Sequence, residues 1–176
     1  SILRIKSESN QKTTFWALKN VSFNIDEGDI VGIIGSNGSG KSTLLRTIGG
    51  VYNPDKGNIT VNGEVSTLLS LGTGFKQELS GYENIILNGL IMGFTKKEII
   101  QKSDEIIHFS ELGDFINEPV KNYSSGMTAR LGFSIAVFLK RDIMLIDEIL
   151  GVGDYSFKKK SQQKMEELIN EGKTFI

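Results

Sequence analysis

The sequence predicts an α/β fold built around a mostly parallel sheet. Two short apolar runs, at 30–34 and 143–146, are typical of strands that are buried on both faces. Helical segments lie between such strands along the chain, and this alternation favours parallel pairing. The chain has 176 residues, of which 39% are hydrophobic and 23% are charged, so it is long enough for one globular domain with its own core.

The individual elements are predicted from their periodicity and from the residues that bound them. Alternating or β-branched runs predict strands at 2–6, 15–25, 30–34, 58–61 and 143–146, with another strand beginning at 173. Helical patterns cover 41–49, 83–93, 95–109, the segment that begins at Ser124, and 157–170. Thr95 is a suitable N-cap for its helix, and Gly49 with Gly50 is suited to end the first helix.

Composition and charge exclude several classes of protein. The formal net charge is −1, which gives no bulk attraction to nucleic acid. There are 0 cysteines, which excludes disulfides and thiolate metal sites. No apolar run approaches the roughly 20 residues that cross a bilayer, and no signal-like segment opens the chain. The chain starts at Ser1 without a Met and ends at 173–176 as a strand begins, so we expect both termini to be cut.

A glycine-rich segment joins the strand at 30–34 to the next helix. It consists of Gly35, Ser36, Asn37, Gly38, Ser39, Gly40, Lys41 and Ser42, followed by Thr43, and it fits the phosphate-binding P-loop pattern. Glycines let backbone N–H groups converge on phosphates, and the helix adds its positive end. Lys41 is expected to reach the β and γ phosphates, and the Ser42 hydroxyl to coordinate Mg²⁺. A flexible Gly/Ser linker would not lie between such a strand and such a helix.

Two acidic residues follow the strand at 143–146. Asp147 and Glu148 are expected at the carboxyl edge of the sheet, where open α/β sheets bind ligands. Asp147 would hold Mg²⁺ directly or through water, and Glu148 would act on the attacking water as a general base. Taken alone, the pair fits a solvated acidic turn equally well. Together with the P-loop, it favours a nucleotide hydrolase.

A third candidate lies at the start of the helix after Tyr123. Ser124, Ser125 and Gly126 form a hydroxyl-rich helix N-terminus, which suits an anion. Serine at a helix start is most often only a cap, so this feature is weak by itself.

The order of these three motifs resembles the nucleotide-binding domain of ABC transporters. Segments 17–45 and 49–59 are similar to that family, and the resemblance covers essentially the whole chain. Tyr123 to Met127 falls at the family's signature motif, usually Leu-Ser-Gly-Gly-Gln, from which Ser125 and Met127 depart. Residues 151–154, ending in Asp154, fall where the family has its D-loop.

The resemblance implies a P-loop NTPase fold with a mostly parallel core, a small antiparallel β subdomain and a helical subdomain. The single domain 1–176 would divide into an ATPase core at 1–75 and 142–176 and a helical subdomain at 76–141, which would touch a separate transmembrane permease subunit. Two copies would pair head to tail around two ATP molecules. Ser124, Ser125 and Gly126 would bind the γ-phosphate in trans, and Asp154 would cross the dimer interface.

The resemblance also implies contacts for which this sequence offers partial candidates. Phe15 and Trp16 are the aromatic residues available to stack on adenine, while one of them could instead pack in the core; Tyr52 is expected to be structural. No glutamine occupies 71–75, where the family's Q-loop residue belongs, and Gln77 is in the wrong register. The switch histidine would follow the strand beginning at 173. His108 is expected to be a partly buried helix residue rather than this switch. Because the group that would hold the γ-phosphate and the water is absent, we expect good ATP binding and weak hydrolysis.

Four segments, 15–18, 71–75, 78–84 and 123–127, resemble ABC subunits that export O-antigen, teichoic acid or capsule polymers. This implies a bacterial ATPase attached peripherally to the cytoplasmic face of the membrane. A soluble ABC-type ATPase acting on DNA or ribosomes would more often contain long insertions or tandem copies, and no basic patch indicates nucleic acid. A GTPase would carry an Asn-Lys-x-Asp segment, and none occurs; a kinase would need an arginine-rich lid, and only scattered arginines such as Arg130 and Arg141 are present. A non-catalytic regulatory module fits less well with Lys41, Asp147 and Glu148 in place.

Overall fold

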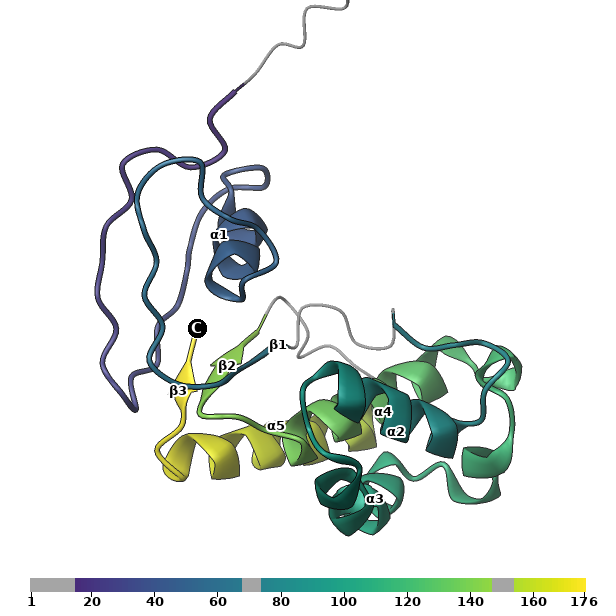
Figure 1. The fold of residues 1–176 in the computed structure, drawn as a ribbon. Coiled ribbons are helices and arrows are strands. Elements are labelled where there is room, and N and C mark those ends of the chain that lie inside the picture. Colours follow the sequence, from purple (N-terminus) through teal and green to yellow (C-terminus); the bar gives the residue numbers. More distant parts are fainter. Residues whose placement is uncertain (1–14, 68–73, 147–153) are drawn as a thin grey trace, which may run out of the picture.

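A parallel sheet forms the centre of the computed structural model, which describes residues 15–67, 74–146 and 154–176 (Figure 1). Strands β1 (Val65–Thr67), β2 (Ile143–Leu145) and β3 (Thr174–Phe175) lie in that order and pair in parallel. A parallel bridge joins Ile30 to Phe175. The Val31 amide donates to the Phe175 carbonyl at 2.8 Å, so the segment that leads into the P-loop lies beside β3.

The described residues contain five α-helices, and all agree with the predicted helices to within a few residues. They are α1 (Lys41–Ile48), α2 (Gly81–Ile91), α3 (Lys96–Ser110), α4 (Ser125–Phe138) and α5 (Tyr155–Asn170). Short 3₁₀ helices, η1 (Gly113–Asn117) and η2 (Val120–Asn122), connect α3 to α4. In Figure 1, α1 lies on one side of the sheet and α5 on the other, with α2, α3 and α4 grouped beside α5.

Local sequence explains where α2 and α3 begin. Each starts with a capping box, in which a hydroxyl side chain and a glutamate three residues later exchange hydrogen bonds with the helix backbone. Ser80 and Glu83 form the first box, and Thr95 and Glu98 form the second. The prediction that Thr95 is an N-cap is therefore confirmed.

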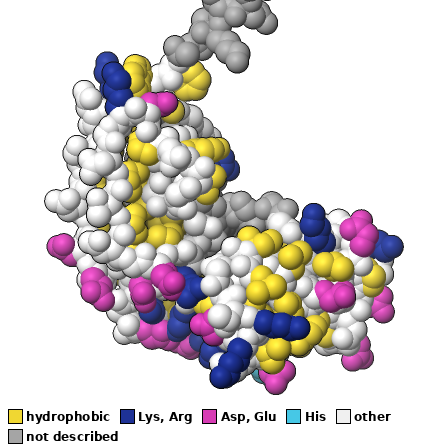
Figure 2. Space-filling view, viewed as in Figure 1, with side chains coloured by type: hydrophobic (Ala, Val, Ile, Leu, Met, Phe, Trp, Pro, Cys, Tyr) yellow, Lys and Arg dark blue, Asp and Glu magenta, His cyan; other side chains and the backbone are white. Residues whose placement is uncertain are grey.

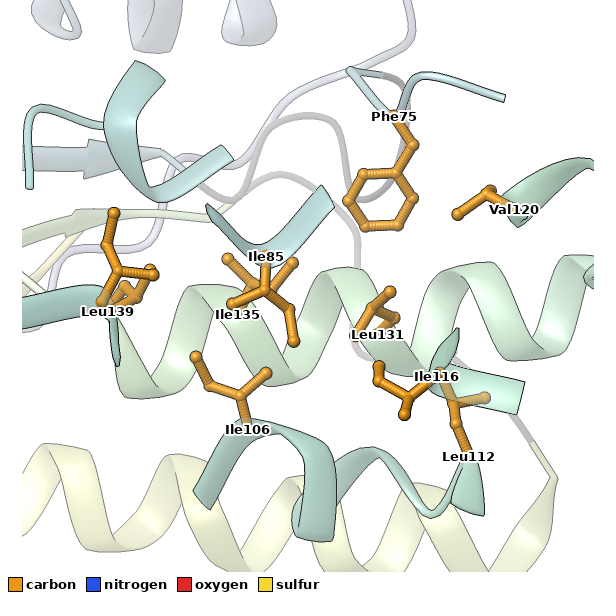
Figure 3. Packing of buried hydrophobic residues seen from close by; sticks show 10 residues of the cluster. Phe75, Ile85, Ile106, Leu112, Ile116, Val120, Leu131, Ile135 and Leu139 are labelled. Atoms are coloured by element: carbon orange, nitrogen blue, oxygen red, sulfur yellow. The ribbon is translucent and has the colours of Figure 1, made fainter. Parts of the chain in front are cut away.

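Hydrophobic packing in the described part of the chain forms two clusters, and α4 contributes to both. The first lies between α4, α5 and the sheet, with Phe133, Phe157 and Phe175 among its members. The second lies between α2, α3 and α4 (Figure 3). There Ile85, Ile106 and Ile135 project into the same space from the three helices. Because helix α4 is buried on two faces, it connects the packing of the helical part of the chain to that of the sheet.

The structure differs from the predicted strands in the first third of the chain. Segments 15–25 and 58–61 are not strands, and within the described residues the only antiparallel pairing is one bridge between Ser80 and Pro119. The sequence predicts a buried run at 30–34, but Ile30 is 59% and Ile34 is 98% exposed. The reason is that, among the described residues, this run meets only β3, at Ile30 and Val31, and no second strand covers it. The predicted strand at 2–6 lies outside the described residues.

Exposed apolar side chains occur on both the sheet side and the helical side of the molecule. Figure 2 shows hydrophobic side chains at the surface of both halves of the molecule. On the sheet side they include Val21, Phe23, Ile59 and Val61, and on the helical side Leu90, Ile91, Ile100 and Phe115.

Candidate phosphate-binding site

The P-loop connects the segment beside β3 to the first turn of α1. Its chain reverses through a hydrogen bond from the Ser39 amide to the Ser36 carbonyl, at 3.2 Å. Gly35 lies close to this turn, because a Cβ there would come within 2.7 Å of the Ser39 Oγ. The predicted phosphate-binding residues 35–43 therefore form one continuous loop and helix start, as their sequence indicates.

Gly40 is the residue where this loop tolerates no side chain. It is the N-cap of α1 with a φ of 93°, in the left-handed region that glycine adopts without penalty. A Cβ at Gly40 would also lie 2.7 Å from the Ala17 carbonyl oxygen and 3.0 Å from a methyl group of Leu18. The loop is thus packed against the segment that precedes the sheet.

Lys41 folds back over the loop that precedes it. Its ammonium group donates hydrogen bonds to the carbonyls of Gly35 and Ser36, both at 2.9 Å. The charge is therefore held above the turn of the P-loop, where it is available to an anion that enters the same space.

The N-terminus of α1 receives no side-chain cap from the described residues and has no acidic residue in its first turn. By contrast, α2, α3, α4 and α5 are each capped by a hydroxyl or carboxylate side chain, from Ser80, Thr95, Ser124 and Asp154. The first amides of a helix need an acceptor, and the positive end of the helix dipole favours an anionic one. This arrangement fits a phosphate group. Ser42 and Thr43 lie in the same turn of α1.

Two other candidate residues follow a strand of this sheet in the sequence. Parallel strands place their carboxyl ends together, and β3 lies between β2 and the segment that enters the P-loop. Asp147 and Glu148 follow β2 by two and three positions in the sequence, but they lie outside the described residues. The 71–75 segment that lacks a glutamine is described only from Gly74 onward.

The signature-like residues lie at the far end of α4 from the sheet. Ser124 caps the helix by accepting a hydrogen bond from the Met127 amide at 3.2 Å, and both Ser124 and Ser125 are exposed. Since α4 has 14 residues, its start is about 20 Å along the helix from its end beside β2. Ser124 and Ser125 therefore lie at the outside of the molecule, at a helix start that Ser124 caps, with Gly126 half-buried in the same turn.

Tyr123 fixes the position of this helix start. Its hydroxyl donates to the Phe115 carbonyl at 2.6 Å, and burial raises the pKa of this phenol. Gly81 lies so close that an added Cβ would overlap the Tyr123 hydroxyl. No local pattern in the sequence indicates this contact, because the partners come from separate segments.

Asp154 has a defined role within its own chain. Its carboxylate accepts from the Phe157 amide at 3.0 Å and so caps α5, and the same bond holds the pKa of Asp154 below its usual range. It also pairs with Arg130 of α4. Any contact of Asp154 across a dimer interface would therefore have to form beside, or in place of, these bonds within its own chain.

The aromatic candidates are exposed. Phe15 is 87% and Trp16 is 58% exposed, and the Lys56 ammonium lies 5.6 Å from the centre of the Trp16 ring. Neither residue packs in a core, so the alternative of a core role for one of them is wrong. Tyr52 is 45% exposed and accepts a hydrogen bond from Arg46 at 3.4 Å.

Gln77 and His108, which the sequence does not favour as site residues, lie in the helical part. The Gln77 side chain is exposed and its backbone carbonyl accepts from the Lys121 amide at 3.0 Å. His108 lies in the last turn of α3 and is exposed, which corrects the expectation of a partly buried ring.

No group of three or more potential His, Asp or Glu metal ligands occurs in the part of the chain that the structure describes. Within that same part, no helix is both long and apolar enough to span a membrane.

Comparison with known proteins places the chain in a family. Residues 18–151 match the family model described as ABC transporter. Among solved structures, the fold is similar to a dimeric ATP-binding cassette in a post-hydrolysis state with bound ADP and Pi, with a TM-score of 0.74, 26% identity and coverage of 90% of this chain and 78% of that one. The chain belongs to the ABC transporter family and has the fold of its ATP-binding cassettes.

Two relatives are named as ATP-binding proteins of polymer export systems. An O-antigen export system ATP-binding protein, RfbB of Myxococcus xanthus, is 51% identical over 99% of this chain and 40% of its own length. A teichoic acids export ATP-binding protein, TagH of Lactococcus lactis, is 53% identical over 98% of this chain and 37% of its own length. The chain thus spans about two fifths of the length of these relatives.

Proposed function

We propose that this chain is the ATP-binding and ATP-hydrolysing part of a bacterial ABC system that exports a polysaccharide-type polymer. The main support for an ATP site is the start of α1, which no described side chain caps and which lies beside the Lys41 ammonium. The export assignment draws on the relatives, which are named as O-antigen and teichoic acid export ATP-binding proteins.

Phosphate binding follows from the contacts around Lys41. An incoming phosphate would accept hydrogen bonds from the first amides of α1 and from the Lys41 ammonium. The ammonium would then exchange the Gly35 and Ser36 carbonyls for the phosphate, which is a stronger partner because it is charged. Residues 35–43 would form this cradle. Trp16, which is exposed and follows Phe15, offers a ring face for the adenine.

Magnesium fits the proposed donor set. The Ser42 hydroxyl and the Asp147 carboxylate supply the oxygen ligands that Mg²⁺ prefers, and the ion would neutralise part of the phosphate charge. Glu148 would accept a proton from the attacking water. Lys41 would stabilise the charge that develops on the phosphate as water attacks.

A second copy of the chain would complete the site. Ser124 and Ser125 are exposed and Gly126 is half-buried at an end of α4 that lies away from the sheet, and the amides of that helix start are suited to a phosphate carried by another molecule. The cassette of similar fold is dimeric. We also keep the division into a core at 1–75 and 142–176 and a helical part at 76–141 as a proposal, with the helical part contacting a membrane-embedded permease at the cytoplasmic face.

Binding is tested by titrating the chain with Mg-ATP and following both calorimetric heat and the fluorescence of Trp16, the only tryptophan. Lys41→Ala should abolish saturable binding, while Lys96→Ala, an exposed position on α3, should bind like the original chain. Absence of binding heat in the unaltered chain would exclude the ATP site.

Hydrolysis and export need separate measurements. Glu148→Gln should retain ATP binding and lose phosphate release, which assigns it to the chemical step rather than to binding. Export coupling is tested by isolating the full-length protein from membranes with a permease that carries polymer-linked lipid. A full-length protein that hydrolyses ATP but remains soluble without such a partner would favour the soluble ABC-type ATPase instead.

A further inference from the structure

Arg141 joins the sheet to the helical part of the molecule. It lies between the end of α4 and the start of β2, and its side chain is 15% exposed. One end of its guanidinium pairs with Glu64, the residue before β1. The other end donates to the Gly93 carbonyl at 2.9 Å, in the turn that follows α2.

Stacking adds a third contact on the helical side. The central guanidinium carbon lies 3.6 Å from the centre of the Phe94 ring. Phe94 packs against the cluster of α2, α3 and α4, and its amide donates to the Gly89 carbonyl at 3.0 Å. A guanidinium that is planar and forked can satisfy an acid, a carbonyl and an aromatic face together, which a lysine ammonium cannot.

On the sheet side, the partner of Arg141 is Glu64, which lies where two strands begin to pair. The Glu64 carbonyl accepts from the Ile143 amide at 3.1 Å, where β1 and β2 begin to pair. Arg141 therefore holds one group at the start of the parallel ladder and another at the α2–α3 turn. Glu64 lies just before β1 and Gly93 just after α2, so Arg141 connects the two ends of the segment that contains both elements.

We propose that Arg141 is a positioning residue that fixes the orientation of α2 and α3, and through them the start of α4, relative to the sheet. The hydrophobic packing that joins the two parts runs through α4 and through Phe109 near the end of α3, whose ring packs against Phe157 of α5. These contacts hold the helical part against α5, whereas the Arg141 contacts connect the α2–α3 turn to Glu64, the residue before β1. The consequence for ATP turnover rests on the proposed function, whereas the orientation itself does not.

Orientation is measured directly between spin labels. Because the chain contains no cysteine, Glu27→Cys on the sheet side and Lys97→Cys on α3 provide two exposed and unique attachment points. In the doubly labelled, nucleotide-free protein, Arg141→Met should broaden and shift the distance distribution. Arg46→Met is the matched control, because that exposed guanidinium donates to Tyr52, on the sheet side, and it should leave the distribution unchanged.

A weaker variant keeps the test decisive if Arg141→Met does not fold. Glu64→Gln removes one exposed charge and should broaden the distribution in the same direction but less. Arg141→Lys should fall between the original protein and Arg141→Met. An unchanged distribution in Arg141→Met, or in Glu64→Gln if the former does not fold, overturns the proposal.

Turnover provides the second readout in the full-length protein. Arg141→Met should lower kcat about fivefold or more while the KM for ATP stays within about twofold, because the α1 site is intact. Loss of ATP binding by the unaltered protein would refute the proposed function and leave the distance result standing. Equal losses in kcat and in ATP affinity would overturn the positioning role.

Discussion

Arg130 of α4 and Asp154 at the start of α5 form an ion pair that connects the helix carrying Ser125 to the segment after Glu148. Arg130 also lies over the Phe157 ring, with its central carbon 5.2 Å from the ring centre. Asp154 additionally caps α5. Two segments expected at the ATP site are thus attached to each other within one chain.

The two functions of Asp154 can be separated by substitution. Asp154→Asn should keep most of the stability, because asparagine caps helices as well as aspartate does and the exposed ion pair contributes little. Asp154→Ala should lower the free energy of unfolding by about 1 kcal/mol through loss of the cap. Urea denaturation of both variants measures the difference. Equal stability of the two would show that the cap contributes nothing.

Substitution of Gly40 should damage the P-loop. Gly40→Ala forces a side chain into the left-handed region, at roughly 1–2 kcal/mol, and overlap with the Ala17 carbonyl adds roughly 1–3 kcal/mol. Gly32→Ala is the matched control, because its Cβ would meet no described atom within 4 Å and its φ is not positive. Thermal unfolding and ATP calorimetry should show a loss for Gly40→Ala only; comparable losses in both variants would contradict the close packing of Gly40 against Ala17.

Packing of the helical cluster depends on Gly89 of α2. A Cβ there would lie 2.6 Å from two carbons of Ile99 and 2.9 Å from a methyl group of Leu139. Gly89→Ala should therefore separate α2 from α3 and α4 and cost roughly 1–3 kcal/mol. Leu90→Ala, at an exposed site on the same helix, should change stability by about 0.5 kcal/mol or less. Chemical denaturation distinguishes the two outcomes.

The capping boxes predict acid sensitivity of α2 and α3. Hydrogen bonds from Ser80 lower the pKa of Glu83, and those from Thr95 lower the pKa of Glu98. A carboxyl with a lowered pKa in the folded state stabilises above its unfolded pKa and loses that contribution as the pH falls through its folded pKa. Melting temperature should therefore fall as the pH drops below about 4.

Glutamine provides the control for this pH dependence. A double variant, Glu83→Gln with Glu98→Gln, keeps capping-box partners that do not titrate. Its melting temperature should fall less steeply between neutral and acidic pH than that of the original chain. Parallel curves for the two proteins would assign the acid sensitivity to other carboxylates, such as Asp142, whose pKa is lowered mainly by its hydrogen bond with Lys173.

Local patterns in the sequence predict the helices, the N-cap at Thr95 and the continuity of the P-loop. These features depend on residues a few positions apart, whose geometry is set by backbone hydrogen bonding. The exposure of Ile34 is not predictable in this way, because burial of a strand depends on which neighbours pair with it. The same apolar run suits an edge segment and a central strand.

Contacts between distant segments also escape prediction. Arg141 reaches Gly93, 48 positions earlier, and Glu64, 77 positions earlier. Nothing in the sequence near Arg141 distinguishes it from a solvated surface arginine. Asp147 and Glu148 remain predictions, since their placement relative to Lys41 is outside the described residues.

The pairing of Ile30 with Phe175 sets an order for folding. The Gly28 amide donates to the Thr174 hydroxyl, 146 positions away, and the segment that leads into the P-loop has β3 as its only described partner. Contacts of such high sequence separation form late, because a long loop must close first. During synthesis, the helices of the second cluster can therefore pack before the nucleotide site exists. A ribosome-bound chain that ends before residue 170 should not bind ATP.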